Sequence, residues 1–192
     1  MKCYVIRVMT GKEKKYISCI ERESSQLDGR ILWPRRSLVI RKSGIKTEKV
    51  SSLYPGYLFW ETGELTDKSI MMLKKASGFI RFLKSDFEIL PISEEERYLL
   101  HNLISGGEVI RQSRVVFDED SRIRVVDGPM KGLEGSIVKV DRRKGRAKVQ
   151  LALHGKCFLV DLGFEVMDFH PEEAVRNFVS LHSEGIDIST TL

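Results

Sequence analysis

The sequence predicts an α+β protein built from an antiparallel sheet with helices, a linker, and a small all-β barrel. Three observations predict this fold class. Strand-like and helix-like segments alternate up to residue 107, a polar stretch with weak periodicity covers residues 108–120, and short β-type runs fill residues 121–168. We therefore expect a first domain at 1–107, a linker at 108–120, a barrel domain at 121–168 and a C-terminal extension at 169–192.

The first domain is expected to open with a strand, because residues 3–9 alternate and are rich in Val, Ile and Tyr. Thr10-Gly11 ends this strand, and apolar residues then recur at helical spacing from Tyr16 to Ile20. The remaining expected elements are strands at 31–40 bent at Pro34, a basic hairpin tip or loop at 41–49, a strand at 56–60, a helix ending near Gly78, a strand at 79–83, and a helix capped by Ser93.

The barrel is expected from four short β-type runs at 123–126, 136–140, 147–153 and 158–162, with glycine-containing turns between them. Short strands at such close spacing are typical of a small closed barrel. A short helix is expected near 172–181, followed by a polar end.

Composition narrows the function classes. The chain has 192 residues, is 42% hydrophobic, and has no apolar run near the roughly 18 residues that cross a bilayer. Its start goes straight into a strand without an apolar leader, so we expect a cytoplasmic protein with no membrane partner. Cys3, Cys19 and Cys157 are too scattered for a disulfide framework or a metal site and are interpreted as small apolar side chains.

Charge is unevenly distributed along the chain. Residues 139–156 hold seven cations and one anion, although the whole chain carries only +5. A dense cluster, Arg142-Arg143-Lys144-Gly145-Arg146, falls at a predicted hairpin tip, where arginine forks can pair with phosphates. A solvated basic loop is the alternative, but the density favours nucleic acid. The stretches 35–36 and 41–49 form a second basic region.

No catalytic constellation is found. The sequence lacks a glycine-rich phosphate loop ending in Lys-Ser/Thr, and its four histidines have no partners at metal-ligand spacing. The acidic run 94–96 is better explained as a helix start stabilised by the helix dipole. We expect no enzyme activity, no cofactor and no metal.

Four segments together resemble the NusG family of transcription elongation factors. Residues 4–13 resemble the opening of its N-terminal (NGN) domain, 54–59 its aromatic-Pro-Gly-Tyr strand entry, and 77–82 its Gly-Phe-Ile strand. Residues 124–138 are similar throughout to the KOW motif of its barrel, which is SH3-like. The runs 141–149 and 162–166 look most like the LoaP-type specialised paralogues, which promote processive antitermination.

The resemblance implies partners and contact residues. The first domain would bind the clamp helices of the largest RNA polymerase subunit and would lie near the non-template DNA. The KOW domain would recruit the protein through nascent leader RNA, and we expect that RNA to form a hairpin. We expect a monomer. On a coarse strand map four aromatics, Tyr4, Tyr57, Phe59 and Phe79, could converge on one sheet face to bind polymerase. The expected RNA-binding residues are Lys131, Arg142, Arg143, Lys144, Arg146, Lys148, His154 and Lys156.

Three alternatives stay open on the sequence; one of them, an enzyme of nucleic acid metabolism, is disfavoured because no acid–base constellation is found. The other two concern binding. In the first, the protein is a general NusG-type factor whose KOW domain binds protein partners, either Rho or a ribosomal protein. In the second, it is a stand-alone RNA-binding protein. The basic tip argues against the former, and the aromatic residues of the first domain argue against the latter.

Overall fold

The computed structural model of the chain describes residues 1–23, 28–83 and 88–167. The expected extension at 169–192 and its short helix lie outside the described residues. The helices of the described part are α1 (Glu13–Glu23), α2 (Asp67–Lys75) and α3 (Glu94–Leu103). The strands are β1 (Lys2–Val8), β2 (Arg30–Leu32), β3 (Arg35–Lys42), β4 (Ile45–Ser52), β5 (Tyr57–Thr62), β6 (Phe79–Phe82), β7 (Val109–Ile110), β8 (Ser113–Phe117), β9 (Ile123–Asp127), β10 (Ile137–Asp141), β11 (Arg146–Leu153) and β12 (Lys156–Val166).

The first domain is built on a four-stranded sheet in the order β2-β5-β1-β6. Its central strands, β1 and β5, are antiparallel and buried on both faces, which explains their nearly continuous apolar sequence. One face packs against Tyr16 of α1 and Leu73 of α2, and the other packs against Leu100 and Leu103 of α3. Because neighbouring residues of a strand point to opposite faces, the register decides which side chains each helix meets.

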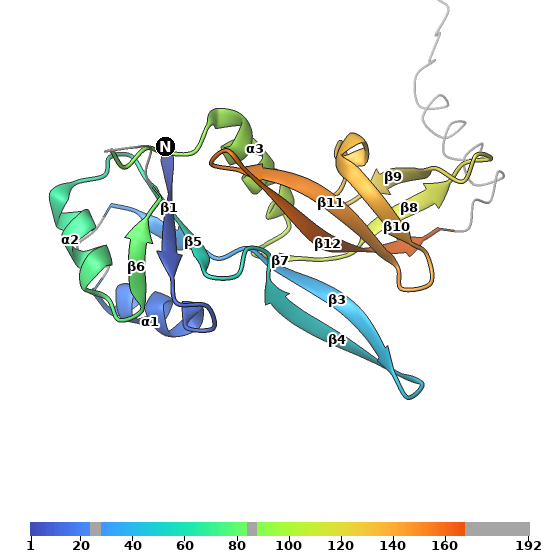
Figure 1. Cartoon of the computed structure of the whole chain (residues 1–192), viewed down its shortest axis with the longest axis horizontal. Helices are drawn as coiled ribbons and strands as arrows, with labels where there is room; N and C mark the ends of the chain where they lie inside the picture. The colour runs from blue at the N-terminus through green and yellow to red at the C-terminus, as the bar shows by residue number, and fades with distance from the viewer. Residues whose placement is uncertain (24–27, 84–87, 168–192) are drawn as a thin grey trace, which may run out of the picture.

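A second, three-stranded sheet carries a long hairpin away from this domain. Strands β3 and β4 pair antiparallel around a turn at Ser43 and Gly44, both with positive φ, and β7 adds to β3 in parallel. The hairpin projects beneath the second domain (Figure 1). The expected hairpin tip at 41–49 is therefore a tight two-residue turn, and most of that segment continues the strands.

The second domain is a five-stranded sheet in the order β10-β11-β12-β8-β9. β12 is its longest strand and pairs with β11 antiparallel and with β8 in parallel. Alternate residues of β11, from Ala147 to Leu153, are buried in the barrel core. The predicted α+β class, with a mixed domain followed by a small all-β domain, is confirmed. The expected closure of the barrel is not seen in the described part, because β9 and β10 lie at the two ends of the sheet and do not pair.

The expected linker at 108–120 contains two strands. β7 pairs with β3 of the first domain, and β8 lies between β12 and β9 in the second. The segment is mostly polar, so its strands were not recognised in the sequence. Only single residues such as Ile110, Ser113 and Val115 are buried, and exposed residues separate them. We propose that the chain passes between the domains at residues 111–112, so the direct connection is far shorter than the sequence indicated.

The two domains pack against each other in a closed arrangement, side by side in Figure 1. A continuous cluster of buried apolar side chains runs from the α3 face of the first sheet into the barrel. None of the helices in the described part combines the length and the apolar character that a membrane span needs.

Candidate functional site

Three aromatic side chains form a compact group on the α3 side of the first sheet. Tyr57 and Phe59 are two residues apart on β5 and so share a face, and Tyr54 precedes them at the Pro55-Gly56 turn. The rings of Tyr54 and Phe59 meet edge to face with centroids 5.8 Å apart. The guanidinium of Arg7 lies 4.5 Å from the Tyr57 ring centre. We call Tyr54, Tyr57 and Phe59 the aromatic face.

The turn before β5 holds this group in place. Gly56 has a φ of +78°, and its N–H donates a 2.8 Å hydrogen bond to the carboxylate of Glu13 on α1. A Cβ at this position would stand 2.7 Å from the Thr10 hydroxyl, so a glycine is required by both conformation and space. The sequence thus fixes where β5 begins and which of its residues reach the aromatic face.

Phe158 of the second domain packs against two members of the aromatic face. Phe158 of β12 lies edge-on to Tyr54 at 5.2 Å and to Tyr57 at 5.7 Å between ring centres. Edge-to-face aromatic pairs of this kind contribute about 0.5–1.5 kcal/mol each beyond the buried area. In the closed arrangement, Tyr54 and Tyr57 are therefore buried, with only 3% and 8% of their surfaces exposed.

Polar contacts flank this apolar seam at both ends. Near one end, the backbone N–H of His154 donates to the carboxylate of Glu96 on α3. Near the other, Arg36 donates to the carbonyl of Asp161 at 2.9 Å, and Arg146 donates to the carbonyl of Val39 at 3.0 Å. Burial lowers the pKa of Arg36, with the neighbouring Arg146 as a further cause, although Asp161 opposes the shift. Closure of the two domains thus places the guanidinium groups of Arg36 and Arg146 close together.

The four aromatics named from the sequence do not share a surface. Tyr4 pairs in register with Trp60 and packs into the helix-covered core with α1 and α2, and Phe79 packs against the same core. Tyr57 and Phe59 face the opposite way, toward α3 and the second domain. The expectation of one common face is wrong because β1 is offset from β5 so that Val5, and not Tyr4, stands opposite Phe59.

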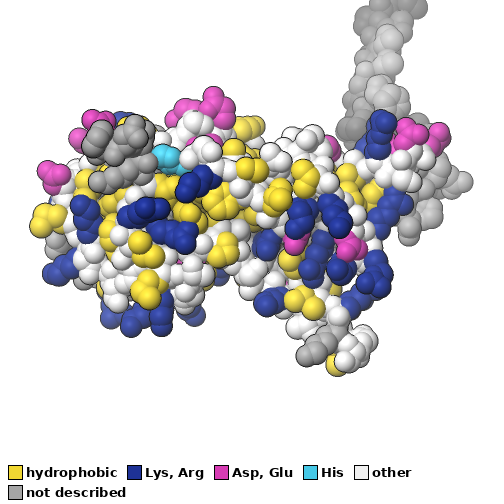
Figure 2. Space-filling model, in the orientation of Figure 1, with side chains coloured by type: hydrophobic (Ala, Val, Ile, Leu, Met, Phe, Trp, Pro, Cys, Tyr) yellow, Lys and Arg dark blue, Asp and Glu magenta, His cyan; other side chains and the backbone are white. Residues whose placement is uncertain are grey.

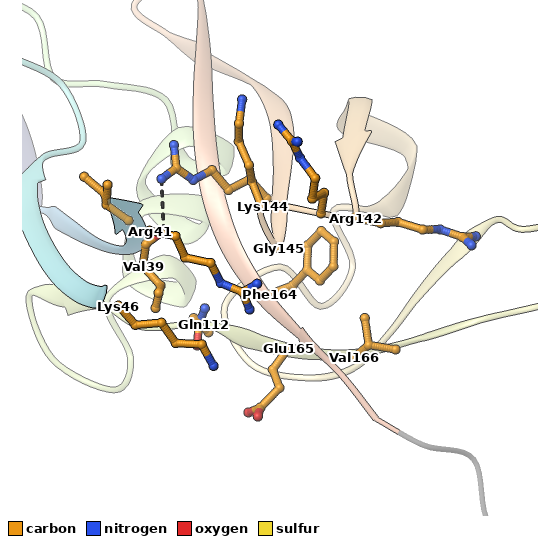
Figure 3. A pocket seen from close by; sticks show the side chains of 13 residues that line it. Val39, Arg41, Lys46, Gln112, Arg142, Lys144, Gly145, Phe164, Glu165 and Val166 are labelled. Atoms are coloured by element: carbon orange, nitrogen blue, oxygen red, sulfur yellow. Dashed lines mark hydrogen bonds between the residues drawn. The ribbon is translucent and has the colours of Figure 1, made fainter. Parts of the chain in front are cut away.

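A basic groove of about 780 Å³ lies where the β3–β4 hairpin meets the β10–β11 turn. Both domains contribute cations to it: Arg41 and Lys46 come from the hairpin, and Arg142, Arg143, Lys144 and Arg146 come from the turn, which we call the basic tip. Figure 3 labels Arg41, Lys46, Arg142 and Lys144 of this set, together with Phe164 and Glu165, which also line the groove. Lys and Arg side chains also gather over the second domain on the face seen in Figure 2.

The basic tip has a defined conformation. The Arg142 guanidinium lies 3.7 Å from the centre of the Phe117 ring and donates to the carbonyl of Ser121. Asp141 accepts from the backbone N–H of Lys144 and lies 3.4 Å from its ammonium group, and these interactions lower the pKa of Asp141. Gly145 turns the chain with a φ of +60°. Arginines ordered in this way lose less entropy when they bind a phosphate.

The other residues expected to bind RNA lie apart from the tip. His154 and Lys156 are at the opposite end of β11, next to α3, and Lys148 forms a 3.2 Å ion pair with Asp161. Lys131 is exposed in the turn after β9. The structure therefore brings together Arg142, Arg143, Lys144 and Arg146 but not the whole set of eight.

Sequence reasoning missed the residues that join the domains. Phe158 carried no distinguishing signal, because its role comes from Tyr54 and Tyr57, which tertiary packing sets against it. Tyr54 could have been found, since it begins the same aromatic-Pro-Gly-Tyr segment as Tyr57.

The titratable groups of the described part do not form a metal centre. Among the residues with described positions, no group of three or more His, Cys, Asp or Glu side chains is arranged to hold a metal ion. Burial, with a smaller effect of Glu61, raises the pKa of Cys3 to about 12, so its thiol stays protonated at neutral pH. The arrangement is suited to binding surfaces.

Comparisons with known proteins find a matching family model for each of the two domains. The family model described as transcription termination factor NusG matches residues 1–101, and the KOW motif model matches residues 119–151. The chain is 25% identical over 175 residues to the transcription termination/antitermination protein NusG of Xylella fastidiosa strain Temecula1, covering 84% of this chain and 95% of that protein. It is also 25% identical over 173 residues to the same-named protein of Thermus thermophilus, covering 84% and 94%.

A solved structure shows the same fold. The structure, which concerns domain interaction in Thermotoga maritima NusG, has a TM-score of 0.59 at 23% sequence identity. The match covers 84% of this chain and 93% of that one. This likeness extends over both domains and bears on the fold alone.

Proposed function

Because the chain belongs to the NusG family of transcription termination and antitermination factors, we propose that it is an elongation factor that binds RNA polymerase with its first domain and nascent leader RNA with its KOW domain. Its effect would be processive antitermination, as in the LoaP-type members that the sequence resembles most. The activity is binding without chemistry: the factor favours one conformer of the polymerase through differential affinity.

The aromatic face is the proposed polymerase contact. Tyr54 and Tyr57 form an apolar surface beside α3, of the kind that anchors an interface by burying large area at small entropic cost. Clamp helices of the polymerase would occupy the place that Phe158 takes in the closed arrangement. Polymerase binding therefore requires the two domains to separate.

The observation that carries the RNA half of the proposal is the basic tip. Four cations within five residues stand on an ordered turn, with Asp141 as the neighbouring carboxylate. Arginine forks on a projecting turn suit the phosphates and the distorted grooves of RNA hairpins and bulges. A KOW domain used only for protein partners has no need of this charge density.

Single-round transcription through an intrinsic terminator tests the proposal. Purified polymerase would be used with and without the protein on two templates, one with the RNA leader of an adjacent long operon and one with a neutral leader. We expect readthrough on the first template only. The variant Arg142→Ser/Arg143→Ser should lose that readthrough while still folding.

The other outcomes separate the alternatives. Equal effects on both templates would contradict recruitment by leader RNA and indicate a general factor. No effect on either template, with RNA binding retained, would contradict the polymerase half of the proposal.

A further inference from the structure

We propose that the basic groove between the β3–β4 hairpin and the basic tip is a two-domain binding site for the sugar-phosphate backbone of an RNA hairpin. The site deepens the proposed RNA function and rests on it: the first domain supplies part of the RNA contact, and it does so only when the domains are closed.

The charges of the groove are unbalanced. Six cations line it, and Glu165 is the single acidic side chain among its lining residues. Arg41 and Lys46 stand directly opposite each other in the hairpin, an arrangement of like charges that weakens a strand pair. In the described part of the chain, no ion pair joins Arg41, Lys46 or Arg143 to a carboxylate. A polyanion would relieve this repulsion.

The shape of the groove favours an RNA hairpin over a small anion. Its walls are two projecting β-hairpins, and its lining includes the apolar side chains of Val39, Phe164 and Val166. Long cations on both walls can reach phosphates on the two strands of a stem, while the apolar side chains of the lining can contact ribose or an unstacked base. A volume of about 780 Å³ exceeds what a single phosphate occupies.

The groove exists only because the domains close. Arg146 ties the tip to the hairpin through the carbonyl of Val39. Gly163 of β12 allows the close approach, since a Cβ there would stand 2.9 Å from Cγ of Gln112 and 3.4 Å from the Ser37 carbonyl oxygen. RNA in the groove must therefore stabilise the closed form, and polymerase, which needs the aromatic face, must weaken RNA binding by the same factor. Once the domains separate on polymerase, the basic tip alone would hold the RNA, with the lower affinity that loss of Arg41 and Lys46 implies.

The direct test removes only the charges that the first domain supplies. The full-length variant Arg41→Ser/Lys46→Ser would be titrated against a fluorescein-labelled 20-nucleotide RNA hairpin carrying an internal bulge, over a range of salt concentrations. We expect about tenfold weaker binding and a salt slope smaller by about two, because each lost phosphate contact removes about one unit. The matched control is Lys14→Ser/Lys15→Ser, which removes two exposed cations from α1 in the same domain.

A second variant tests dependence on closure without changing a charge. Gly163→Val should push the domains apart and weaken binding of the same RNA about as much as the hairpin variant. Because valine is favoured in β-strands, we expect the barrel of this variant to stay folded. Its circular dichroism spectrum checks that expectation.

The outcomes distinguish this site from the proposed function. If Arg142→Ser/Arg143→Ser weakens RNA binding but Arg41→Ser/Lys46→Ser and Gly163→Val do not, the tip alone binds RNA, and the two-domain site is wrong. If none of them weakens binding, the proposed RNA function fails as well. If a single-stranded DNA of equal length binds as tightly and with the same dependence on Arg41 and Lys46, the assignment to RNA is overturned.

Discussion

Phe158 links the two domains through one aromatic ring. It contacts both Tyr54 and Tyr57, whereas the next residue, Leu159, is 58% exposed on the other side of β12. Phe59 has a different role. It is fully buried between the sheet and α3, so its removal would damage the core of the first domain before it affected any partner. Tyr57 is therefore the better position at which to test polymerase binding.

Changing Phe158 to Ser should open the molecule. Loss of two edge-to-face pairs corresponds to about 2 kcal/mol, which raises the ratio of open to closed molecules roughly thirtyfold. Fluorescence energy transfer between dyes on the two domains would measure the change. Leu159→Ser is the control, and equal transfer in both variants would contradict the role given to Phe158.

Tyr57→Ala should weaken polymerase binding at least tenfold, because a central aromatic anchor contributes about 2 kcal/mol or more. The measurement is a pull-down titration with core polymerase. Phe59→Ala, by contrast, should lower the free energy of unfolding by about 3–5 kcal/mol. Unchanged polymerase affinity of Tyr57→Ala would remove the aromatic face from the proposal.

Gly128 and Gly132 of the KOW domain make a matched pair. Both have positive φ, +104° and +81°, but a Cβ at Gly128 would stand 2.8 Å from the Cα of Ser113, and one at Gly132 would meet nothing within 4 Å. Each change to Ala should cost about 1 kcal/mol of backbone strain. Gly128→Ala should cost roughly 1–3 kcal/mol more from overpacking, as measured by urea unfolding. Equal losses would show that the contact with β8 is unimportant.

At the scale of elements, a buried carboxylate ties α3 to the first sheet. Glu61 of β5 is 2% exposed and accepts hydrogen bonds from Arg30 of β2 at 2.8 Å and from His101 of α3 at 2.6 Å. Burial alone would raise the pKa of Glu61, but these partners outweigh it and hold the pKa below its ordinary value of 4.5. The position of α3, and with it the surface that receives His154, depends on this cluster.

The pH dependence of stability follows from that shift. As the pH falls, the unfolded chain binds the Glu61 proton first, so the stabilisation is complete above about pH 5 and is lost as the pH falls through the lower pKa of the folded state. Glu61→Gln should cost roughly 2 kcal/mol at pH 7 and should flatten the loss of stability between pH 5 and 3. Thermal unfolding at several pH values measures this, with exposed Glu64→Gln as the control. If Glu61→Gln and the unaltered chain lost stability over the same pH range and by the same amount, the pH dependence could not be assigned to Glu61.

At the scale of the whole molecule, closure presents one surface and hides another. The closed form assembles the basic groove from two domains and covers the aromatic face with β12. A ligand that prefers one form shifts the population by as much as its affinities for the two forms differ. RNA in the groove and polymerase on the aromatic face are thus expected to oppose each other in the isolated protein.

Gly163→Val tests this coupling from the polymerase side. The added side chain should destabilise the closed form, so polymerase affinity should rise several-fold while RNA affinity falls. Binding of core polymerase to the variant and to the unaltered chain measures the effect. A fall in polymerase affinity would contradict the coupling. Unfolding of the barrel would also expose the aromatic face, so the circular dichroism spectrum of the variant must match that of the unaltered chain.

Local patterns in the sequence were sufficient to predict most of the elements and the fold class. Alternating apolar residues predicted β1, Ser93 and Glu96 predicted the capping box of α3 that the structure contains, and glycine turns predicted the short strands of the second domain. These features are local, because propensity, caps and turns act within a few residues. The basic tip was also found, since its charge is continuous in sequence.

Only the tertiary structure decided which surfaces meet. The register of β1 against β5 sent Tyr4 and Tyr57 to opposite faces, and a shift of one residue would have reversed the outcome. The strands within 108–120, the contact of Phe158 with Tyr54, and the approach of Arg41 to the basic tip depend on residues far apart in the chain. Such contacts are set by how whole domains pack, and no local pattern encodes them.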